Sequence, residues 1–250
     1  MDRDEPVIVS GKRAVLEALR AGEVGEVLIA KGSRQSPAMQ DVLDAARSAE
    51  VPTHEVERAA LDALAEDHRG VVAKIDAMPT RTTLGERDLS TFRWASDAMA
   101  VILDGVEDPQ NLGAAARSIE ASGAQMLITR THRAAPVTAT AVRASAGALL
   151  HLPHARVANL SRAIERLQDA GFTVIGLDED APRSIYDEAC PTGRVALVLG
   201  SEGFGISRLV REHCDLLVSL PMHGKVGSLN AAASLAAVLY GYVLPTRGDA

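Results

Sequence analysis

The sequence predicts an α/β fold in two parts, with a parallel sheet in the larger, C-terminal part. Helical and strand patterns alternate along most of the 250 residues, which is typical of a layered α/β architecture. The segments 98–104 and 195–200 are almost wholly apolar, as expected of strands that helices cover on both faces. Because aromatic residues make up only 3% of the chain, the core must consist mainly of Ala, Val, Leu and Ile.

The first part is expected to form a small α/β domain over residues 1–77. Apolar residues at helical spacing, a Ser-Pro start and Gly stops define its helices. The expected helices cover 11–22, 36–51 and 58–65, and the expected strands cover 26–30, 51–56 and 70–75. Residues 78–96 contain Pro79 and Gly85 and show little apolar periodicity. This segment is expected to be a linker, or a hinge that contains a helix.

The second domain, 97–250, is expected to alternate strands and helices more regularly. Its expected strands are 98–104, 124–129, 172–178, 195–200 and 216–221, and its expected helices are 111–123, one within 138–153, 159–171, 206–214 and 228–242. In parallel sheets of this kind, ligands bind beyond the carboxyl ends of the strands. The loops that follow the strands are therefore where chemistry is expected.

The loop after strand 98–104 leads into a helix that carries Asn111 and Arg117. Asn111 is expected to cap that helix, and Gly113 permits close approach at its first turn. Arg117 follows on an Ala-rich helix, where it is either a solvated side chain or a group that binds phosphate or lowers the pKa of a hydroxyl. Spacing alone does not decide between these two interpretations.

The loop after strand 195–200 reads GSEGFGIS. Its glycines let backbone N–H groups meet a ligand, although the pattern is neither a dinucleotide fingerprint nor a phosphate-binding loop with its lysine. A carboxylate, Glu202, in the middle of the turn favours a functional role. After strand 216–221, Ser228 is expected to cap the last helix, and Leu229 and Asn230 are candidates to face a ligand.

Several classes of protein are not supported by the sequence. The net charge of −7 and the pI of about 5.5 do not indicate a basic surface over the whole chain. Cys190 and Cys214 lack metal or disulfide spacing and are expected to be free thiols in a reducing cytoplasm. His151 and His154 lie close together, but no Cys or Glu completes a metal site. The apolar stretch 228–246 is expected to be a buried helix, and no membrane partner is expected.

Three segments resemble the motifs of a known enzyme family. NLGAAAR (111–117), LVLGSEG (197–203) and the pair LPM (220–222) and SLNAA (228–232) resemble motifs 1, 2 and 3 of the SpoU (TrmH-like) RNA 2′-O-ribose methyltransferases of the SPOUT superfamily. LDGVEDPQNLGA, TGRVALVLGSEG and REHCD are similar to the RlmB-type branch, which methylates a guanosine ribose in 23S rRNA. GKRAVLEAL resembles the start of the small, L7Ae-like RNA-binding domain of that branch.

The resemblance implies a fold and an activity. The C-terminal domain is expected to contain a deep trefoil knot, which is otherwise nearly absent from proteins. The protein is expected to be a cytoplasmic homodimer that uses S-adenosylmethionine to methylate RNA, with no metal. Alternative substrates are tRNA or another rRNA ribose, and a different class of function is a non-catalytic RNA-binding assembly factor.

The resemblance also implies roles for individual residues. Arg117 would help to deprotonate the ribose 2′-hydroxyl, Asn111 would position Arg117 or the substrate, and Glu202 would fix Arg117 or the motif 2 loop. Ser228 and Asn230 would position the ribose and phosphate. The residues expected to bind the cofactor are Leu199, Gly200, Ser201, Gly203, Leu220, Pro221, Met222, Ser228 and Leu229.

One segment between motifs 1 and 2 is basic despite the negative total charge. Residues 130–166 contain six Arg and a single acidic residue, Glu165. Arg130, Arg133 and Arg143 of this segment are expected to contact RNA phosphates, or else to form a solvated helical face. The low aromatic content favours recognition of phosphate and ribose over base stacking.

Overall fold

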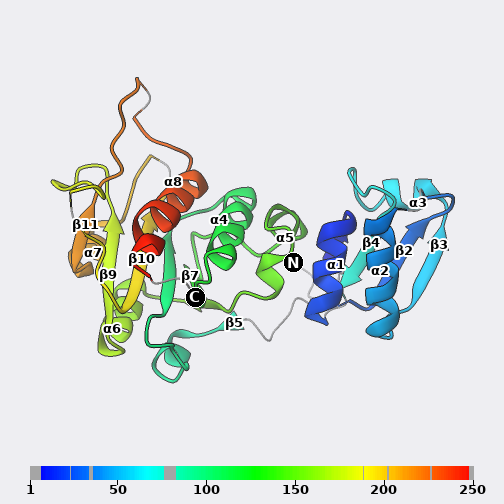
Figure 1. Cartoon of the computed structure of the whole chain (residues 1–250), viewed down its shortest axis with the longest axis horizontal. Helices are drawn as coiled ribbons and strands as arrows, with labels where there is room; N and C mark the ends of the chain where they lie inside the picture. The colour runs from blue at the N-terminus through cyan, green and yellow to red at the C-terminus, as the bar shows by residue number, and fades with distance from the viewer. Residues whose placement is uncertain are drawn as a thin grey trace.

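The structure, a computed structural model, describes residues 7–22, 24–33, 36–75, 83–187, 189–201, 203–225 and 227–247. Figure 1 shows a small N-terminal domain beside a larger C-terminal domain, as the sequence predicts. Each domain has its own sheet.

The N-terminal domain is a four-stranded mixed sheet with helices. Its strands are β1 (Val7–Ser10), β2 (Glu26–Ala30), β3 (Thr53–Val56) and β4 (Val71–Ile75), and its helices are α1 (Lys12–Ala21), α2 (Pro37–Ser48) and α3 (Arg58–Asp62). The strand order is β1-β4-β2-β3. β2 and β3 are parallel, whereas β4 is antiparallel to both of its neighbours. Strand β1 was not expected from the sequence, because it has only four residues and shows no clear strand pattern.

The C-terminal domain is built on a seven-stranded sheet in the order β11-β9-β10-β6-β7-β8-β5. The strands are β5 (Thr83–Leu84), β6 (Met99–Asp104), β7 (Met126–Arg130), β8 (His154–Val157), β9 (Phe172–Leu177), β10 (Arg194–Gly200) and β11 (Leu216–Val218). All of their pairings are parallel. This confirms the predicted parallel sheet, and β5 and β8 add two strands that the sequence pattern did not indicate.

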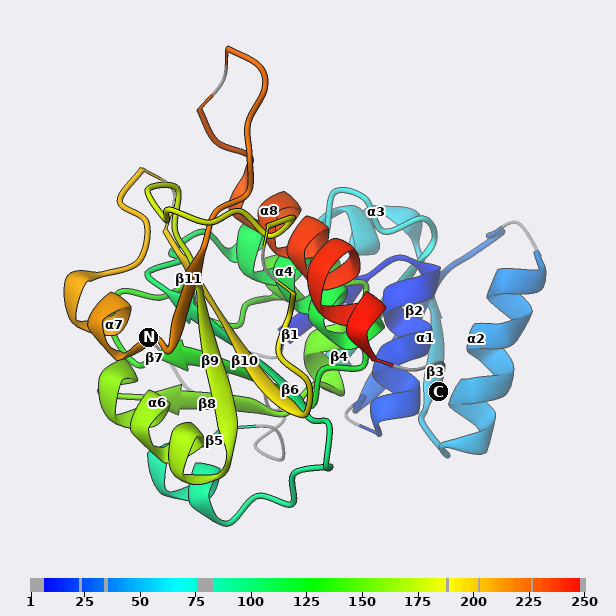
Figure 2. The same ribbon diagram turned by 60° about the vertical axis from the view of Figure 1, so that its left-hand side comes forward.

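Helices cover both faces of this sheet. They are α4 (Pro109–Ala121), α5 (Ala139–Ala144), α6 (Leu160–Asp169), α7 (Arg208–His213) and α8 (Ala231–Val238), with short helical turns η2 (Glu86–Ser90), η3 (Ala148–Leu150), η4 (Leu239–Val243) and η5 (Leu244–Thr246). Figure 2 shows α6 and α7 on one side of the strands and α4 and α8 on the other. The alternation in β6 agrees with this, since Val101 and Leu103 belong to one buried cluster and Ala100 and Ile102 to the other.

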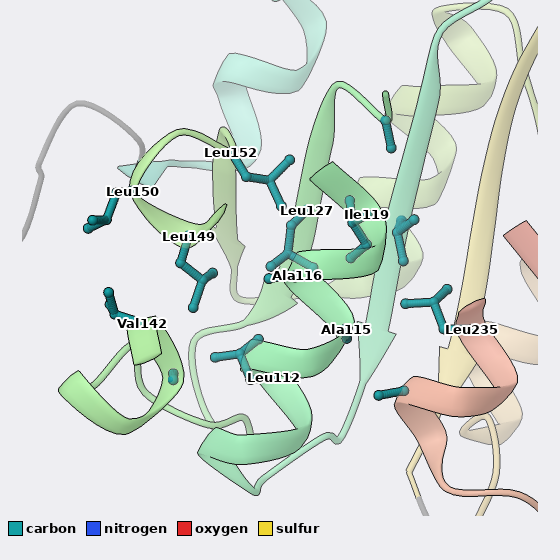
Figure 3. Packing of buried hydrophobic residues seen from close by; sticks show 14 of the residues in the cluster. Leu112, Ala115, Ala116, Ile119, Leu127, Val142, Leu149, Leu150, Leu152 and Leu235 are labelled. Atoms are coloured by element: carbon teal, nitrogen blue, oxygen red, sulfur yellow. The ribbon is translucent and has the colours of Figure 1, made fainter. Parts of the chain in front are cut away.

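Helix α4 lies at the centre of the first cluster. Figure 3 shows Leu112, Ala116 and Ile119 of α4 between the α5–η3 segment and Leu235 of α8. A Cβ atom at Gly113 would overlap the carbonyl oxygen of Ala141. The missing side chain therefore allows α4 and α5 to approach closely, as the sequence predicts for this glycine.

Two helices begin at residues other than those expected. Asp108, not Asn111, is the N-cap of α4, since its carboxylate accepts a hydrogen bond from the backbone N–H of Gln110 and Pro109 starts the first turn. Asn230, not Ser228, is the N-cap of α8. Ser and Asn both cap helices well, so residue type alone could not choose between positions 228 and 230.

Part of the expected linker packs on the C-terminal domain. Thr83 and Leu84 pair with β8, and Leu89 of η2 is fully buried in the cluster beneath α6. Trp94 packs against Phe92 and Phe172. Residues 78–82 of the expected linker lie outside the described residues.

The two domains meet where β1 contacts α5 and α1 contacts η3. A Cβ atom at Gly147, whose φ is +92°, would lie 2.5 Å from the Cβ of Glu17. His151 Nε2 lies 3.4 Å from a carboxylate oxygen of Glu17. The backbone of the C-terminal domain therefore contacts α1 closely at this junction.

Among the described residues, none of the helices has the length and apolarity that a membrane crossing requires. Cys190 and Cys214 are free, as expected. Burial, followed by the charges of nearby Asp215, Asp178 and Asp104, raises the pKa of Cys214 to about 12. This thiol is therefore poorly nucleophilic in the folded protein.

The buried His154 should make folding stability depend on pH. Burial, and secondarily the charge of Arg156, lowers the pKa of His154 to about 4. The unfolded chain takes up this proton near the ordinary pKa of about 6.5, so stability is lost as the pH falls from about 6.5 towards 4. This residue should contribute a loss of about 2 kcal/mol between pH 7 and pH 5.

Urea unfolding of the wild type and of His154→Gln at both pH values measures this contribution. The variant should lose less stability on acidification than the wild type. An equal loss in both proteins would contradict the expectation.

Candidate functional site

One cavity lies at the carboxyl edge of the C-terminal sheet. Strand β10 pairs in register with β6 on one side and β9 on the other, so that Gly200 aligns with Asp104 and Leu199 with Leu177. The loops that follow these strands therefore begin at the same edge. A cavity of about 140 Å³ opens there, lined by residues that follow β9, β10 and β11 and by the start of α8.

Most residues that the sequence suggests for cofactor binding line this one cavity. They are Leu199, Gly200, Ser201, Gly203, Leu220, Met222, Ser228 and Leu229. Pro221 is not among the lining residues, although both of its neighbours are. The structure thus brings together three segments that are separated by up to 30 residues in the chain.

Other lining residues were missed. Leu177 is the last residue of β9 and Glu179 follows that strand, whereas Ala231 and Ser234 belong to α8. The signal for Leu177 and Glu179 was present, because the segment after an apolar strand at 172–178 obeys the same carboxyl-edge rule. Ala231 lies within motif 3, whereas Ser234 lies beyond it and could be found only from the packing of the helix.

A tight turn after β10 forms one wall of the cavity. The backbones of Ser201 and Gly205 exchange two hydrogen bonds of 3.0 and 3.1 Å. A Cβ atom at Gly200 would overlap the backbone of Gly205, and Gly203 and Gly205 have φ values of +80° and +62°. The turn therefore needs glycine at Gly200 for space and at the other two positions for conformation. Glu202 lies outside the described residues.

Asn111 and Asn230 are in direct contact, although they are far apart in the chain. The side-chain oxygen of Asn230 accepts hydrogen bonds from the backbone N–H groups of Ala232 and Ala233. Its Nδ2 donates a hydrogen bond of 2.8 Å to Oδ1 of Asn111. The capping bonds thus fix the orientation of Asn230, which in turn holds the side chain of Asn111 at the start of α4.

Arg117 lies apart from this group. Six residues of helix separate it from Asn111, a shift of roughly 9 Å along the axis and about 120° around it. Arg117 is exposed and lines a different cavity at the domain junction, together with Arg13, Glu17 and His151. Within one chain, the structure therefore brings together Asn111 and Asn230 but not Arg117.

The three arginines expected to contact RNA have different surroundings. Arg130 donates hydrogen bonds to the buried carboxylate of Asp104, at 2.7 Å, and to Ser207. Its charge is therefore paired, and it fixes the chain after β6. Arg133 and Arg143 are exposed and line two separate clefts.

The cleft that contains Arg143 spans the two domains. Its basic residues are Lys12, Arg13, Arg69 and Arg143. Asp67 also lines the cleft and pairs with Arg69. Lys12 and Arg13 come from α1 and Arg143 from the C-terminal domain, so both domains contribute to the positive charge that remains at the junction. Among the described residues, no group of three His, Cys, Asp or Glu side chains is arranged to hold a metal ion.

Comparison with known proteins decides the family. The model of the SpoU rRNA methylase family matches residues 98–240, and the model described as RNA 2′-O ribose methyltransferase substrate binding matches residues 8–80. The chain belongs to the SpoU family. A protein of Mycolicibacterium vanbaalenii described as an uncharacterized tRNA/rRNA methyltransferase is 39% identical over 244 residues, which cover 94% of this chain and 76% of the relative.

Solved structures of the SpoU family share the fold. One described as an RNA 2′-O ribose methyltransferase has a TM-score of 0.81 and 27% identity, covering 98% of this chain and 90% of the other. The SpoU methyltransferase AviRb from Streptomyces viridochromogenes, solved with the cofactor AdoMet, has a TM-score of 0.77 and 28% identity, covering 98% and 92%. The parallel sheet and these similarities confirm the predicted fold class, a SPOUT-type knotted α/β domain with a small N-terminal α/β domain.

The contact between Gly200 and Gly205 gives a prediction for this SpoU protein. Gly200→Ala should lower the free energy of unfolding by about 1–3 kcal/mol, because the added methyl group overlaps the backbone of the turn. Thermal or urea unfolding measures the change.

The matched control is Gly241→Ala, where a Cβ atom meets nothing within 4 Å. That variant should be as stable as the wild type or slightly more so. Equal stability of the two variants would show that the turn after β10 does not require glycine at this position.

Proposed function

We propose that this protein transfers a methyl group from S-adenosylmethionine to the 2′-hydroxyl of a guanosine ribose in 23S rRNA. The observation that supports the proposal best is the joining of all three motifs at one edge of the sheet. Motif 2 and motif 3 residues line a single cavity, and Asn111 of motif 1 is hydrogen-bonded to Asn230 of motif 3 beside it.

The cavity has the chemistry that S-adenosylmethionine requires. Leucine and methionine side chains, among them Leu199, Leu220 and Met222, supply apolar walls for an adenine. The glycine turn exposes backbone groups next to them. Glu179 is an exposed carboxylate at the cavity, where it can accept hydrogen bonds from ribose hydroxyls. The bound cofactor supplies a methyl group on a sulfonium, which is transferred directly to an oxygen nucleophile.

The protein must activate the ribose hydroxyl. A sugar hydroxyl is a weak nucleophile until its proton is removed or its developing negative charge is stabilised. We assign this role to the guanidinium of Arg117, whose positive charge can stabilise the developing alkoxide, while the proton of the hydroxyl passes to solvent water. Asn111 and Ser228 would position the ribose, and Glu202 would support the loop between them.

The position of Arg117 supports a homodimer. This residue lies in a cavity that shares no lining residue with the proposed cofactor cavity of the same chain. In the dimer that we propose, Arg117 of one subunit serves the cofactor cavity of the other. The active site would then require both copies of the chain.

The proposed RNA substrate fits the charge at the domain junction. Lys12, Arg13, Arg69 and Arg143 form a positive cleft between the domains, and such clusters bind phosphates. A relative is named a tRNA/rRNA methyltransferase. The choice of a guanosine in 23S rRNA rests on the segments that resemble the RlmB-type branch. The proposed reaction takes place in the cytoplasm, where rRNA is matured.

Methyl transfer to RNA tests the proposal. The protein is incubated with tritiated S-adenosylmethionine and either 23S rRNA or tRNA from a strain that lacks the gene, and the labelled nucleotide is mapped by nuclease digestion and mass spectrometry. A 2′-O-methylguanosine in 23S rRNA is expected. A labelled base, or label only in tRNA, would overturn the assignment of the substrate.

Replacing Arg117 should separate catalysis from cofactor binding. Arg117→Ala should lower kcat by roughly 100-fold or more, because a preorganised group that stabilises developing charge is lost. The dissociation constant for S-adenosylmethionine, measured by calorimetry, should stay near the wild-type value. The control is Arg47→Ala, which removes an exposed arginine on α2 that pairs with Asp44.

Mixed dimers test the shared site. Arg117→Ala and Gly200→Ala subunits are each expected to be inactive alone. After they are mixed and exchanged, part of the dimers should regain one intact site and hence activity. No recovery, with exchange confirmed by differently tagged subunits, would show that each chain uses its own Arg117.

A further inference from the structure

A second cleft lies on the other side of the turn that borders the proposed cofactor cavity. Its volume is about 880 Å³, which is large enough for a nucleotide. Ser201 and Gly205 line both the cleft and the cofactor cavity. The turn after β10 therefore separates the cofactor cavity from the larger cleft.

Phe204 lies in that turn, between Ser201 and Gly205. It is 91% exposed, the highest fraction among the large hydrophobic residues that are exposed in the described part of the chain. It lines the large cleft, and it also lines a smaller hollow together with Asn111 and Ala231. Phe204 thus lies between the asparagine proposed to position the ribose and the open cleft.

The backbone on both sides of Phe204 is fixed. Ser201 and Gly205 bond to each other before and after it, and Ile206 is buried. The N–H of Ser207 donates a hydrogen bond of 2.8 Å to the buried carboxylate of Asp104. An exposed aromatic ring on a fixed turn loses little conformational freedom when a flat ligand stacks on it.

The walls of the cleft carry charges of both signs: the carboxylates of Asp104 and Glu107 and the guanidinium groups of Arg130, Arg133 and Arg208. Arg130 is paired with Asp104. Arg133 and Arg208 line it, and both are exposed. Arg208 pairs with Glu212 at the surface, an ion pair that contributes little in water and can exchange for a phosphate. Asn159 and Ser161 add further hydrogen-bonding groups. An apolar protein partner would leave these groups desolvated, whereas single-stranded RNA satisfies them.

We propose that Phe204 is a base-stacking residue that holds the unpaired nucleotide next to the methylated one, while Arg133 and Arg208 bind the phosphates of that nucleotide. This inference rests on the proposed function, since it assumes that the target ribose lies beside Asn111. It makes the cleft a specificity site for the RNA strand, separate from both the cofactor cavity and the basic cleft between the domains.

Steady-state methylation of in vitro transcribed 23S rRNA tests the proposal. Stacking of one base on an aromatic side chain contributes about 1–3 kcal/mol, so Phe204→Ala should raise KM for the RNA by about 5- to 150-fold. Neither kcat at saturating RNA nor the dissociation constant for S-adenosylmethionine should change. Phe204→Trp should keep the wild-type KM, whereas Phe204→Leu, apolar but not aromatic, should resemble the alanine variant.

A fluorescence experiment reports stacking directly and needs no methyl transfer. The single native tryptophan, Trp94, packs against Phe92 and Phe172, so RNA should not change the emission of the wild type. In Phe204→Trp, the added indole should be quenched when the same RNA binds in the presence of S-adenosylhomocysteine. Tyr186→Ala is the matched control, because Tyr186 is 73% exposed but lines neither the cleft nor the cavity.

The outcomes separate the two proposals. If the wild type methylates 23S rRNA and Phe204→Ala has the same KM, the stacking role is wrong while the proposed function stands. Three other results would also overturn the stacking role, because each indicates general apolar contact. They are a wild-type KM in Phe204→Leu, an equal rise of KM in Tyr186→Ala, and a change in subunit association in Phe204→Ala. If the wild type methylates no RNA, the proposed function itself fails.

Discussion

The fit of Gly200 against the backbone of Gly205 is the constraint on which the carboxyl edge of the sheet depends. No side chain can be placed at Gly200, because it would overlap the turn that follows. The turn therefore folds back directly over the end of β10, the strand between β9 and β6. Ser201 and Gly205 of this short turn line both the proposed cofactor cavity and the larger cleft. The turn therefore separates the two.

Hydrogen bonds from distant segments hold this edge in place. The carboxylate of Asp104, at the end of β6, joins Arg130 of β7 to the N–H of Ser207. The pair formed by Asn111 and Asn230 joins α4 to α8. Buried or capped groups of this kind are costly to leave without partners. The edge is thus organised by polar contacts, although the strands that lead to it are almost wholly apolar.

Much of this architecture could be predicted from the sequence, and the failures have physical reasons. The apolar strands β6 and β10 and the Gly-stopped helices are encoded locally and were found. Strand β1 and the short β5 form only because neighbouring strands pair with them, which no local pattern reports. For the site, the motifs identified most of the residues that line the cavity. They did not show that Arg117 lies away from Asn111 along and around helix α4. The exposure of Phe204 could be seen only in the three-dimensional structure. The low aromatic content favours recognition of phosphate and ribose over base stacking, and the stacking role that we propose for Phe204 departs from that expectation.

The junction between the domains has an evolutionary consequence. α1 approaches the C-terminal domain closely because residue 147 has no side chain, and that residue also adopts a φ of +92°. A side chain at this one position would overlap Glu17 of α1 and would strain the backbone. Gly147 does not line the proposed cofactor cavity, so the packing of the two domains and the composition of that cavity can change independently during evolution.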